Sequence, residues 1–302
     1  MNPMKILVVG SSNTDMVIKT HKFPAPGETI LGGRFLMNAG GKGANQAVAA
    51  ARLGGVVAFV GKIGDDIFGK QAVQQLEDEG INVDFVAVDP ENPSGVAMIT
   101  VDRNAENSIV VAPGSNGTLT SADFDKATTK LDESDFVLMQ LEIPIPTVDY
   151  IARQAAQKQK KVILNPAPAA SLSGELLKNL YLITPNETEA ELLTGIKVTD
   201  EASALKAAES LHEKGVGAVI ITMGAAGAFL SEGGNAEMIK APKVEAVDTT
   251  AAGDTFNGAL AVALAEGKTL TESIAFANKA ASISVTRIGA QSSVPFRKEI
   301  SN

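Results

Sequence analysis

The sequence predicts a doubly wound α/β fold, with a mostly parallel central sheet flanked by helices, and three observations support this prediction. Short continuous runs of Val, Ile and Leu recur along the chain, and such runs are typical of parallel strands covered on both faces. Most runs are followed by a segment of helical periodicity, which is the pattern of an α/β protein. The 302 residues are 45% hydrophobic, so the chain can bury a large core.

The expected elements alternate along the chain as strand and then helix. The apolar runs predict strands at residues 5–10, 56–61, 135–140, 161–165, 180–184 and 218–222. The segments of helical periodicity predict helices at residues 44–53, 69–79, 147–158, 201–214, 253–265 and 270–285. Because helices follow strands repeatedly, we expect them to cover both faces of one sheet.

Two segments break this alternation. Residues 16–38 are rich in Pro and Gly, and residues 95–112 alternate between apolar and polar positions without a following helix. They are either ordinary surface hairpins or a small inserted antiparallel sheet, which would form a lid over a ligand. We find no internal repeat or linker, so residues 1–302 are expected to form a single domain with this lid.

The composition excludes several classes of function. The chain carries 26 basic and 35 acidic residues, a net charge of −9, which disfavours nucleic acid and acidic membranes as partners. It has no cysteine, so disulfides, thiolate nucleophiles and cysteine-based zinc sites are excluded. We see neither a secretory signal nor an apolar stretch long enough to span a bilayer. These features predict a soluble cytoplasmic protein.

The strongest local signal is the run DTTAAGD at residues 248–254, which leads directly into an apolar helical segment. The backbone N–H groups of Ala252, Gly253 and Asp254 would lie at the helix N-terminus, which favours anion binding. Asp254 could accept a proton from an attacking hydroxyl, and the arrangement suits phosphoryl transfer. The alternative is that Asp254 simply caps the helix.

Two further segments contain residues that could contact a nucleotide. No GxxxxGK[ST] motif is present, which disfavours a P-loop kinase. The small residues of TMGAAG, at 222–227, follow a predicted strand and could pass close to a nucleotide. Asn186 and Glu189 lie three residues apart at a predicted helix start, where their oxygens could hold Mg²⁺ through water. The same spacing equally fits an N-cap with a capping-box Glu.

A second group of polar residues is suited to binding a sugar. Gly40 and Gly41 allow the backbone to approach a ligand closely. Several polar side chains follow predicted strands or begin a predicted helix, and open α/β sheets bind ligands at the carboxyl ends of their strands. Each taken alone is more often a solvated loop residue, so the prediction depends on their occurring together. They are Asn13, Asp15, Lys42, Asn45 and Glu142.

Two long motifs occur in order along the chain: GGKGANQAVAAARLG at 40–54 with VGKIGDD at 60–66, and then DTTAAGDTFNGAL at 248–260. They resemble the first and second signatures of the PfkB family of carbohydrate kinases, and the resemblance covers residues 6–295. The segments that resemble the ribose-specific members are NPAPA at 165–169, TPNETEAELLTG at 184–195 and VTRIGAQSSVP at 285–295. The resemblance implies a ribokinase-like fold and ATP-dependent phosphorylation of D-ribose at its 5-hydroxyl, giving ribose 5-phosphate and ADP.

The resemblance also implies a role for each matching residue. Asp254 is the general base, and Ala252 and Gly253 form the anion hole for the γ-phosphate. The sugar-binding positions are Asn13, Asp15, Gly41, Lys42, Asn45, Glu142 and Asp254. The ATP-binding positions are Asn186, Thr222, Gly224, Gly227, Gly253 and Asn278. Mg²⁺ is associated with Asn186 and Glu189. The K⁺ positions are Asp248, Thr250, Ser284, Arg287, Gly289 and Ser293.

This sequence departs from the family pattern at two of these places. The family commonly has His where this chain has Asn278, and the signature GAGD reads Ala251-Ala252-Gly253-Asp254 here. Alanine still offers a backbone N–H, so we expect the anion hole to remain. The family's two lid segments pair across a homodimer, which implies the same for residues 16–38 and 95–112.

Three alternative functions follow from the same residues. The first is a kinase of the same family for deoxyribose, fructose or adenosine. Asn13 favours ribose over 2-deoxyribose, because a polar amide suits a 2-hydroxyl. The second is a non-enzymatic sugar-binding regulator, which the intact run at 248–254 disfavours. A Rossmann dehydrogenase is excluded, because VVGSSNTD lacks the second and third glycines of GxGxxG.

Overall fold

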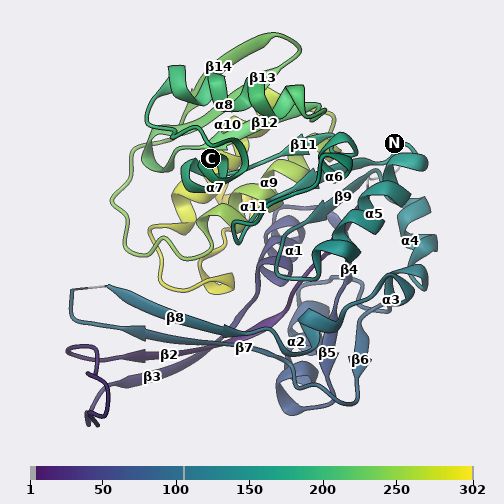
Figure 1. Ribbon diagram of the computed structural model, residues 1–302. Coiled ribbons are helices and arrows are strands. Elements are labelled where there is room, and N and C mark those ends of the chain that lie inside the picture. Colours follow the sequence, from purple (N-terminus) through teal and green to yellow (C-terminus); the bar gives the residue numbers. More distant parts are fainter. Residues whose placement is uncertain (1–4, 105, 301–302) are drawn as a thin grey trace.

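The largest element of the fold is an eight-stranded sheet with the order β14-β13-β12-β11-β10-β9-β1-β4 (Figure 1). The computed structural model describes residues 5–104 and 106–300. The sheet is parallel from β12 to β4, and β13 is antiparallel to both of its neighbours. The strands are β1 (Lys5–Val9), β4 (Val56–Val60), β9 (Phe136–Met139), β10 (Lys161–Leu164), β11 (Leu182–Ile183), β12 (Ala218–Thr222), β13 (Gly227–Glu232) and β14 (Asn235–Lys240).

Helices cover both faces of this sheet, because successive strand residues point to opposite sides. Ile6 and Val8 belong to the hydrophobic cluster on one face, and Leu7 and Val9 to the cluster on the other. The helices of the first face are α1 (Lys42–Arg52), α2 (Ile67–Asp78), α9 (Ala252–Ala265), α10 (Leu270–Ser284) and α11 (Arg297–Ile300). Those of the second are α3 (Ser121–Asp125), α4 (Thr128–Glu133), α5 (Ile145–Gln157), α6 (Gly174–Lys178), α7 (Glu187–Thr194) and α8 (Glu201–Glu213).

The predicted strands and helices all form, and their observed ends lie within two residues of the expected ones. The doubly wound fold is therefore confirmed. Among the helices of the described residues, none is both long enough and apolar enough to cross a membrane. The remaining short elements are β5 (Lys62–Gly64), β6 (Ala87–Asp89), η1 (Gly114–Thr118), η2 (Gly224–Ala226) and η3 (Gln291–Ser293).

A separate four-stranded sheet, which we call the lid sheet, projects from the α/β body (Figure 1). Its order is β3-β2-β7-β8, so the two inserted segments form one sheet rather than independent hairpins. Residue 105, inside the predicted lid segment 95–112, and the ends of the predicted domain 1–302 lie outside the described residues. The strands are β2 (Asn13–Lys19), β3 (Arg34–Gly40), β7 (Gly95–Val101) and β8 (Asn107–Ala112).

The expectation of a purely antiparallel lid is wrong for its central pair. Strands β2 and β7 run parallel, with Asn13 opposite Gly95 at the end near the body. Both strands leave the body side by side in the same direction, so they must be parallel. Each then returns through its own antiparallel partner, β3 or β8.

Close packing of α1 against α9 brings the two glycine-rich motifs together. A Cβ atom on Gly258 of α9 would lie 2.6 Å from both the Gln46 carbonyl oxygen and the Ala49 Cβ of α1. Only glycine therefore allows this approach of the two helices. The packing places the first turn of α9, with Asp254, beside the first turn of α1, with Asn45.

Candidate active site

Helix α9 begins at Ala252, and its N-cap is Ala251 rather than Asp254. Asp254 is the third residue of the helix and is buried, so the interpretation of Asp254 as a simple helix cap is wrong. Ala251 has a left-handed backbone, with φ 57° and ψ 18°. That conformation costs an L-residue roughly 1 kcal/mol and suits glycine, which agrees with the usual Gly of the GAGD signature.

The predicted anion site at the start of α9 is open. A Cβ atom on Gly253 would meet nothing within 4 Å, so the space beside this residue is free. The N–H groups of the first helical turn point out of the helix end, where the helix dipole favours negative charge. The N–H of Ala252 donates to the Thr249 carbonyl oxygen at 3.2 Å, so the loop and the helix start form one turn.

The Asp254 carboxylate is held by two amide donors from α1. Asn45 Nδ2 donates to Asp254 Oδ2 at 2.9 Å, and Gln46 Nε2 donates to Asp254 Oδ1 at 3.0 Å. The Asn45 Oδ1 atom is buried and has no hydrogen-bond partner among the residues that the structure describes. A buried acceptor of this kind is suited to receive a donor from a ligand hydroxyl.

Glu142 lies beyond the carboxyl end of β9 and contacts the start of α1. Its Oε2 atom accepts from the Lys42 backbone N–H at 2.9 Å and from Ser11 Oγ at 2.5 Å. The Gly41 backbone has φ 87°, and a Cβ atom there would lie 2.7 Å from the Asn13 backbone nitrogen. Glycine is therefore required where the lid strand β2 and the start of α1 meet.

Asn13 and Asp15 point to the same face of the lid sheet, because they lie two residues apart in β2. Asn116, from η1, donates through Nδ2 to Asn13 Oδ1 at 2.8 Å. The amide oxygen of Asn13 is thus engaged, and its amide nitrogen is the group that it can offer to a ligand. The Asp15 carboxyl lies against Gly40, where a Cβ atom would come within 2.3 Å of both carboxyl oxygens.

The residues predicted to bind the sugar include several carboxylates that surround Lys42. Burial raises the pKa of Asp15 to about 7, and the nearby carboxylates of Glu142 and Asp254 contribute. Burial alone would lower the pKa of Lys42, but surrounding carboxylates raise it above its usual value; they are Asp254, Glu142, Glu189 and Asp15. A site so rich in acceptors is suited to a ligand that brings several hydroxyl donors.

The nucleotide-type motifs also lie side by side. Asn186 and Thr222 form a parallel β-bridge, and the Thr222 backbone N–H donates to the Pro185 carbonyl oxygen at 2.9 Å. Gly224 and Gly227 have φ 52° and 114°, so the turn after β12 uses backbone conformations that favour glycine.

Asn186 and Glu189 form the capping box that the spacing predicts. Asn186 Oδ1 accepts from the Glu189 N–H at 2.8 Å, and Glu189 Oε2 accepts from the Asn186 N–H at 2.9 Å. Burial raises the pKa of Glu189. Asn278 is buried on α10, and its Nδ2 donates to the Ile239 carbonyl oxygen at 2.9 Å. That amide nitrogen therefore joins α10 to β14.

Asp248 joins two of the loops predicted to hold a cation. Its Oδ1 accepts from the Thr250 N–H, and its Oδ2 accepts from the Gly289 N–H, both at 2.9 Å. Burial raises the pKa of Asp248, but hydrogen bonds from the Thr250 side chain and from the Gly289 and Thr250 N–H groups lower it overall, so the carboxylate stays charged. Of the other four predicted side chains, Ser284 contacts Ala281, Arg287 contacts Glu299 and Ser293 contacts Ala290.

Sequence reasoning missed four buried amides near these residues. Gln46 contacts Asp254 directly, Gln140 and Asn165 contact Gln46, and Asn116 contacts Asn13. Gln46 could have been found from the sequence, because it is a polar residue within an otherwise apolar helical segment. The signal for Gln140 and Asn165 was their position at the ends of predicted strands.

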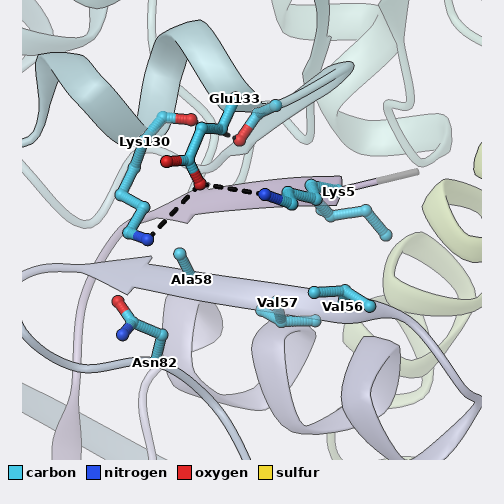
Figure 2. A pocket seen from close by; sticks show the side chains of 9 residues that line it. Lys5, Val56, Val57, Ala58, Asn82, Lys130 and Glu133 are labelled. Atoms are coloured by element: carbon cyan, nitrogen blue, oxygen red, sulfur yellow. Dashed lines mark hydrogen bonds and ion pairs between the residues drawn. The ribbon is translucent and has the colours of Figure 1, made fainter. Parts of the chain in front are cut away.

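A cavity of about 120 Å³ lies between β1, β4 and α4 and is lined by residues outside these motifs (Figure 2). Figure 2 shows the Glu133 carboxylate between Lys5 and Lys130, at 3.0 and 3.4 Å from their ammonium groups. Lys5 and Val56 begin their strands, so the cavity is at the amino edge of the sheet. None of the predicted site residues lines it, and ligand sites of parallel sheets lie at the opposite edge.

Comparisons with known proteins identify the family of the chain. Residues 4–297 match the family described as pfkB family carbohydrate kinase. A ribokinase from Haemophilus influenzae is 49% identical over 97% of this chain and 96% of its own length. A deoxyribokinase from Salmonella typhimurium is 39% identical over 97% of this chain and 96% of its own length. A solved structure of Arabidopsis thaliana ribokinase complexed with ribose and ATP has a TM-score of 0.94, with 34% identity, covering 99% of this chain and 98% of that one.

Proposed function

The chain belongs to the pfkB family of carbohydrate kinases, and we propose that it transfers the γ-phosphoryl group of ATP to the 5-hydroxyl of D-ribose. The observation that carries this proposal is the position of Asp254. Its carboxylate is held by two α1 amides at the first turn of α9, beside the open space at Gly253. A base and an anion site thus occupy one helical turn.

In the proposed reaction the 5-hydroxyl oxygen attacks the γ-phosphorus of ATP. The new O–P bond forms as the bond to the β-phosphate oxygen breaks, and ADP leaves with those electrons. Asp254 accepts the hydroxyl proton. The N–H groups at the start of α9 stabilise the negative charge on the transferred group, and little other chemistry is required of the protein. An enzyme that consumes ATP in this way fits the cytoplasmic location that the sequence predicts.

The residues proposed for Mg²⁺ fit an ion held mainly by ATP and water. Asn186 Oδ1 and Glu189 Oε2 already accept backbone hydrogen bonds, which leaves the second Glu189 oxygen for such an ion. The described residues contain no cluster of three or more acidic or His side chains that could hold a metal directly. When bound, Mg²⁺ would neutralise phosphate oxygens, as its preference for water and phosphate ligands allows.

The K⁺ proposal rests on Asp248. One carboxylate that bridges the 248–250 loop and Gly289 is a hard oxygen donor of the kind a monovalent cation prefers. Because their side chains already have hydrogen-bond partners, the residues Ser284, Arg287 and Ser293 would contribute backbone carbonyl oxygens to the cation site. A cation here would fix the loop that precedes the anion site.

We expect ribose to be preferred to 2-deoxyribose by about 10- to 100-fold in kcat/KM. Asn13 is buried and offers its amide nitrogen, so the absence of the 2-hydroxyl would leave an N–H group unpaired, at a cost of about 1 to 3 kcal/mol. The measurement is a panel of ribose, 2-deoxyribose, fructose and adenosine with ATP and Mg²⁺, with and without K⁺. Equal turnover of ribose and 2-deoxyribose would refute the ribose assignment.

We also propose that the lid sheets of two chains pair to form a homodimer. Ile109 lies in β8 on the same face of the lid sheet as Asp15, and it is exposed, as is Val111 on that face. A single lid sheet leaves these apolar side chains in water, and a second copy would cover them.

Ile109→Asp should convert the dimer to a monomer in sedimentation velocity at micromolar concentration, because it places a charge in the proposed contact. The matched control is Ile67→Asp, on the exposed start of α2, which should stay dimeric. A wild-type monomer, or a dimer that persists in Ile109→Asp, would contradict this interface.

A further inference from the structure

We propose that Gln46 positions the Asp254 carboxylate for proton transfer and that Gln140 fixes the orientation of Gln46. Both glutamines are fully buried, so they act through Asp254 without touching either substrate. The inference rests on the proposed function, in which Asp254 is the base. It assigns a part of the catalytic rate to two side chains outside the substrate contacts.

The hydrogen bonds of Gln46 allow only one orientation of its amide. Its Nε2 donates to Asp254 Oδ1 at 3.0 Å and to Asn165 Oδ1 at 3.1 Å, which uses both N–H bonds. Its Oε1 accepts from Gln140 Nε2 at 2.6 Å. If the amide flipped, its oxygen would face two acceptor oxygens and its nitrogen would face a donor.

This arrangement divides the roles of the two Asp254 oxygens. Oδ1 is bound from the protein interior by Gln46, whereas Oδ2 is bound by Asn45, whose own Oδ1 is a buried acceptor with no partner in the described part of the chain. Asn45 is a predicted sugar contact, so Oδ2 is the oxygen directed toward the sugar. Gln46 therefore fixes the carboxylate through Oδ1 and leaves Oδ2 directed toward the sugar.

The same network reaches the anion site. Asn165 Nδ2 donates to the Thr184 carbonyl oxygen at 3.3 Å, and Thr184 Oγ1 donates to Asn257 Oδ1 at 2.6 Å. Asn257 Nδ2 then donates to the Gly253 carbonyl oxygen at 2.8 Å. The base and the anion-site glycine are thus supported by one set of buried amides.

These amides are costly to bury, which supports a role beyond packing. Residues 43–50 of α1 are all buried, and an apolar side chain at position 46 would avoid the cost of desolvating an amide. Gln140 Oε1 is buried with no hydrogen-bond partner among the residues described. Gly10 leaves room for it, since a Cβ atom there would lie 2.2 Å from that oxygen.

The first test is Gln46→Met, which keeps the length of the side chain and removes both donors. We expect kcat to fall about 100-fold, because loss of the anchor lets the base move from its reactive position. KM for ribose should change by less than about threefold, since the predicted sugar contacts remain. Ser273→Ala is the control; it removes a fully buried hydroxyl that has no partner in the described structure, and kcat should be unchanged.

A pH-dependent test separates positioning from packing. In Gln46→Glu the introduced carboxyl can donate to Asp254 only when it is protonated, so its rate relative to wild type should rise as the pH falls. The relative rate of Gln46→Met should not depend on pH. Gln140→Met leaves the Gln46 bond to Asp254 in place but removes the donor that holds the Gln46 amide oxygen, and we expect an intermediate loss of kcat, about 10-fold.

A wild-type kcat in both Gln46→Met and Gln140→Met would overturn the inference. So would parallel losses of kcat, ribose affinity and melting temperature in Gln46→Met with no pH dependence in Gln46→Glu, which would indicate packing alone. If Gln46→Met does not fold, Gln140→Met decides the question. Failure of the proposed function is distinct, since the wild-type enzyme would then phosphorylate no sugar of the panel.

Discussion

Asp254→Asn is expected to lower kcat for ribose phosphorylation by about 10³-fold, because an amide cannot take the hydroxyl proton. The side chain keeps its size within the contacts from Asn45 and Gln46. Its amide nitrogen would face one of these two donors, so a modest loss of stability, about 1 kcal/mol, should accompany the change. Steady-state kinetics with ribose and ATP measure the first effect, and thermal unfolding measures the second.

A measurement of ribose binding distinguishes a variant that has lost only the catalytic base from one that has lost the whole binding site. Calorimetric titration of Asp254→Asn with ribose should still show binding, because the other proposed sugar contacts are on β2, α1 and the segment after β9. The control is Asp65→Asn, which removes a carboxylate exposed near the start of α2 and should behave as wild type. Asp254→Asn with a normal rate would refute the assignment of Asp254 as the base.

Gly253→Val should lower kcat/KM for ATP by about 10²- to 10³-fold while the protein stays folded. The space beside Gly253 is open, and its φ is not positive, so a side chain is accepted without strain. The added methyl groups would occupy the place proposed for the γ-phosphate and keep it from the helix N–H groups. The measurement is the ATP dependence of the rate at saturating ribose.

Gly174→Val is the matched control for this change. Gly174 also lies at a helix start, on α6, and a Cβ atom there would likewise meet nothing within 4 Å. Kinetics of Gly174→Val should equal those of wild type. Gly253→Val with unchanged kcat/KM for ATP would place the phosphate elsewhere than the start of α9.

The fold could be predicted well, because apolar runs and helical periodicity are local signals. The parallel pairing of β2 with β7 could not be predicted, because it depends on the positions at which the two strands leave the α/β body. The role of Asp254 at its helix start was ambiguous for a similar reason. Only the left-handed Ala251 backbone shows that the helix begins at Ala252 and that Asp254 is its third residue, within the first turn.

The sugar end of the site was predictable in part, because polar residues after parallel strands meet at one edge of the sheet. The structure brings Asn45 to Asp254 and Glu142 to the start of α1, as that reasoning requires. The Gln46 network was not predictable, since its members lie far apart in sequence and meet only where α1 packs against α9 and against the carboxyl ends of β9 and β10. The engagement of Asn278 with Ile239 depends in the same way on packing.

The most direct test of the account is to identify the product that wild type and Asp254→Asn make from ribose and ATP. Phosphorus NMR of the wild-type reaction should show ribose 5-phosphate and ADP in equal amounts, and the same amount of Asp254→Asn should give almost none. Hydrolysis of ATP without a sugar phosphate, a phosphate on another hydroxyl, or equal product from the two proteins would contradict the account.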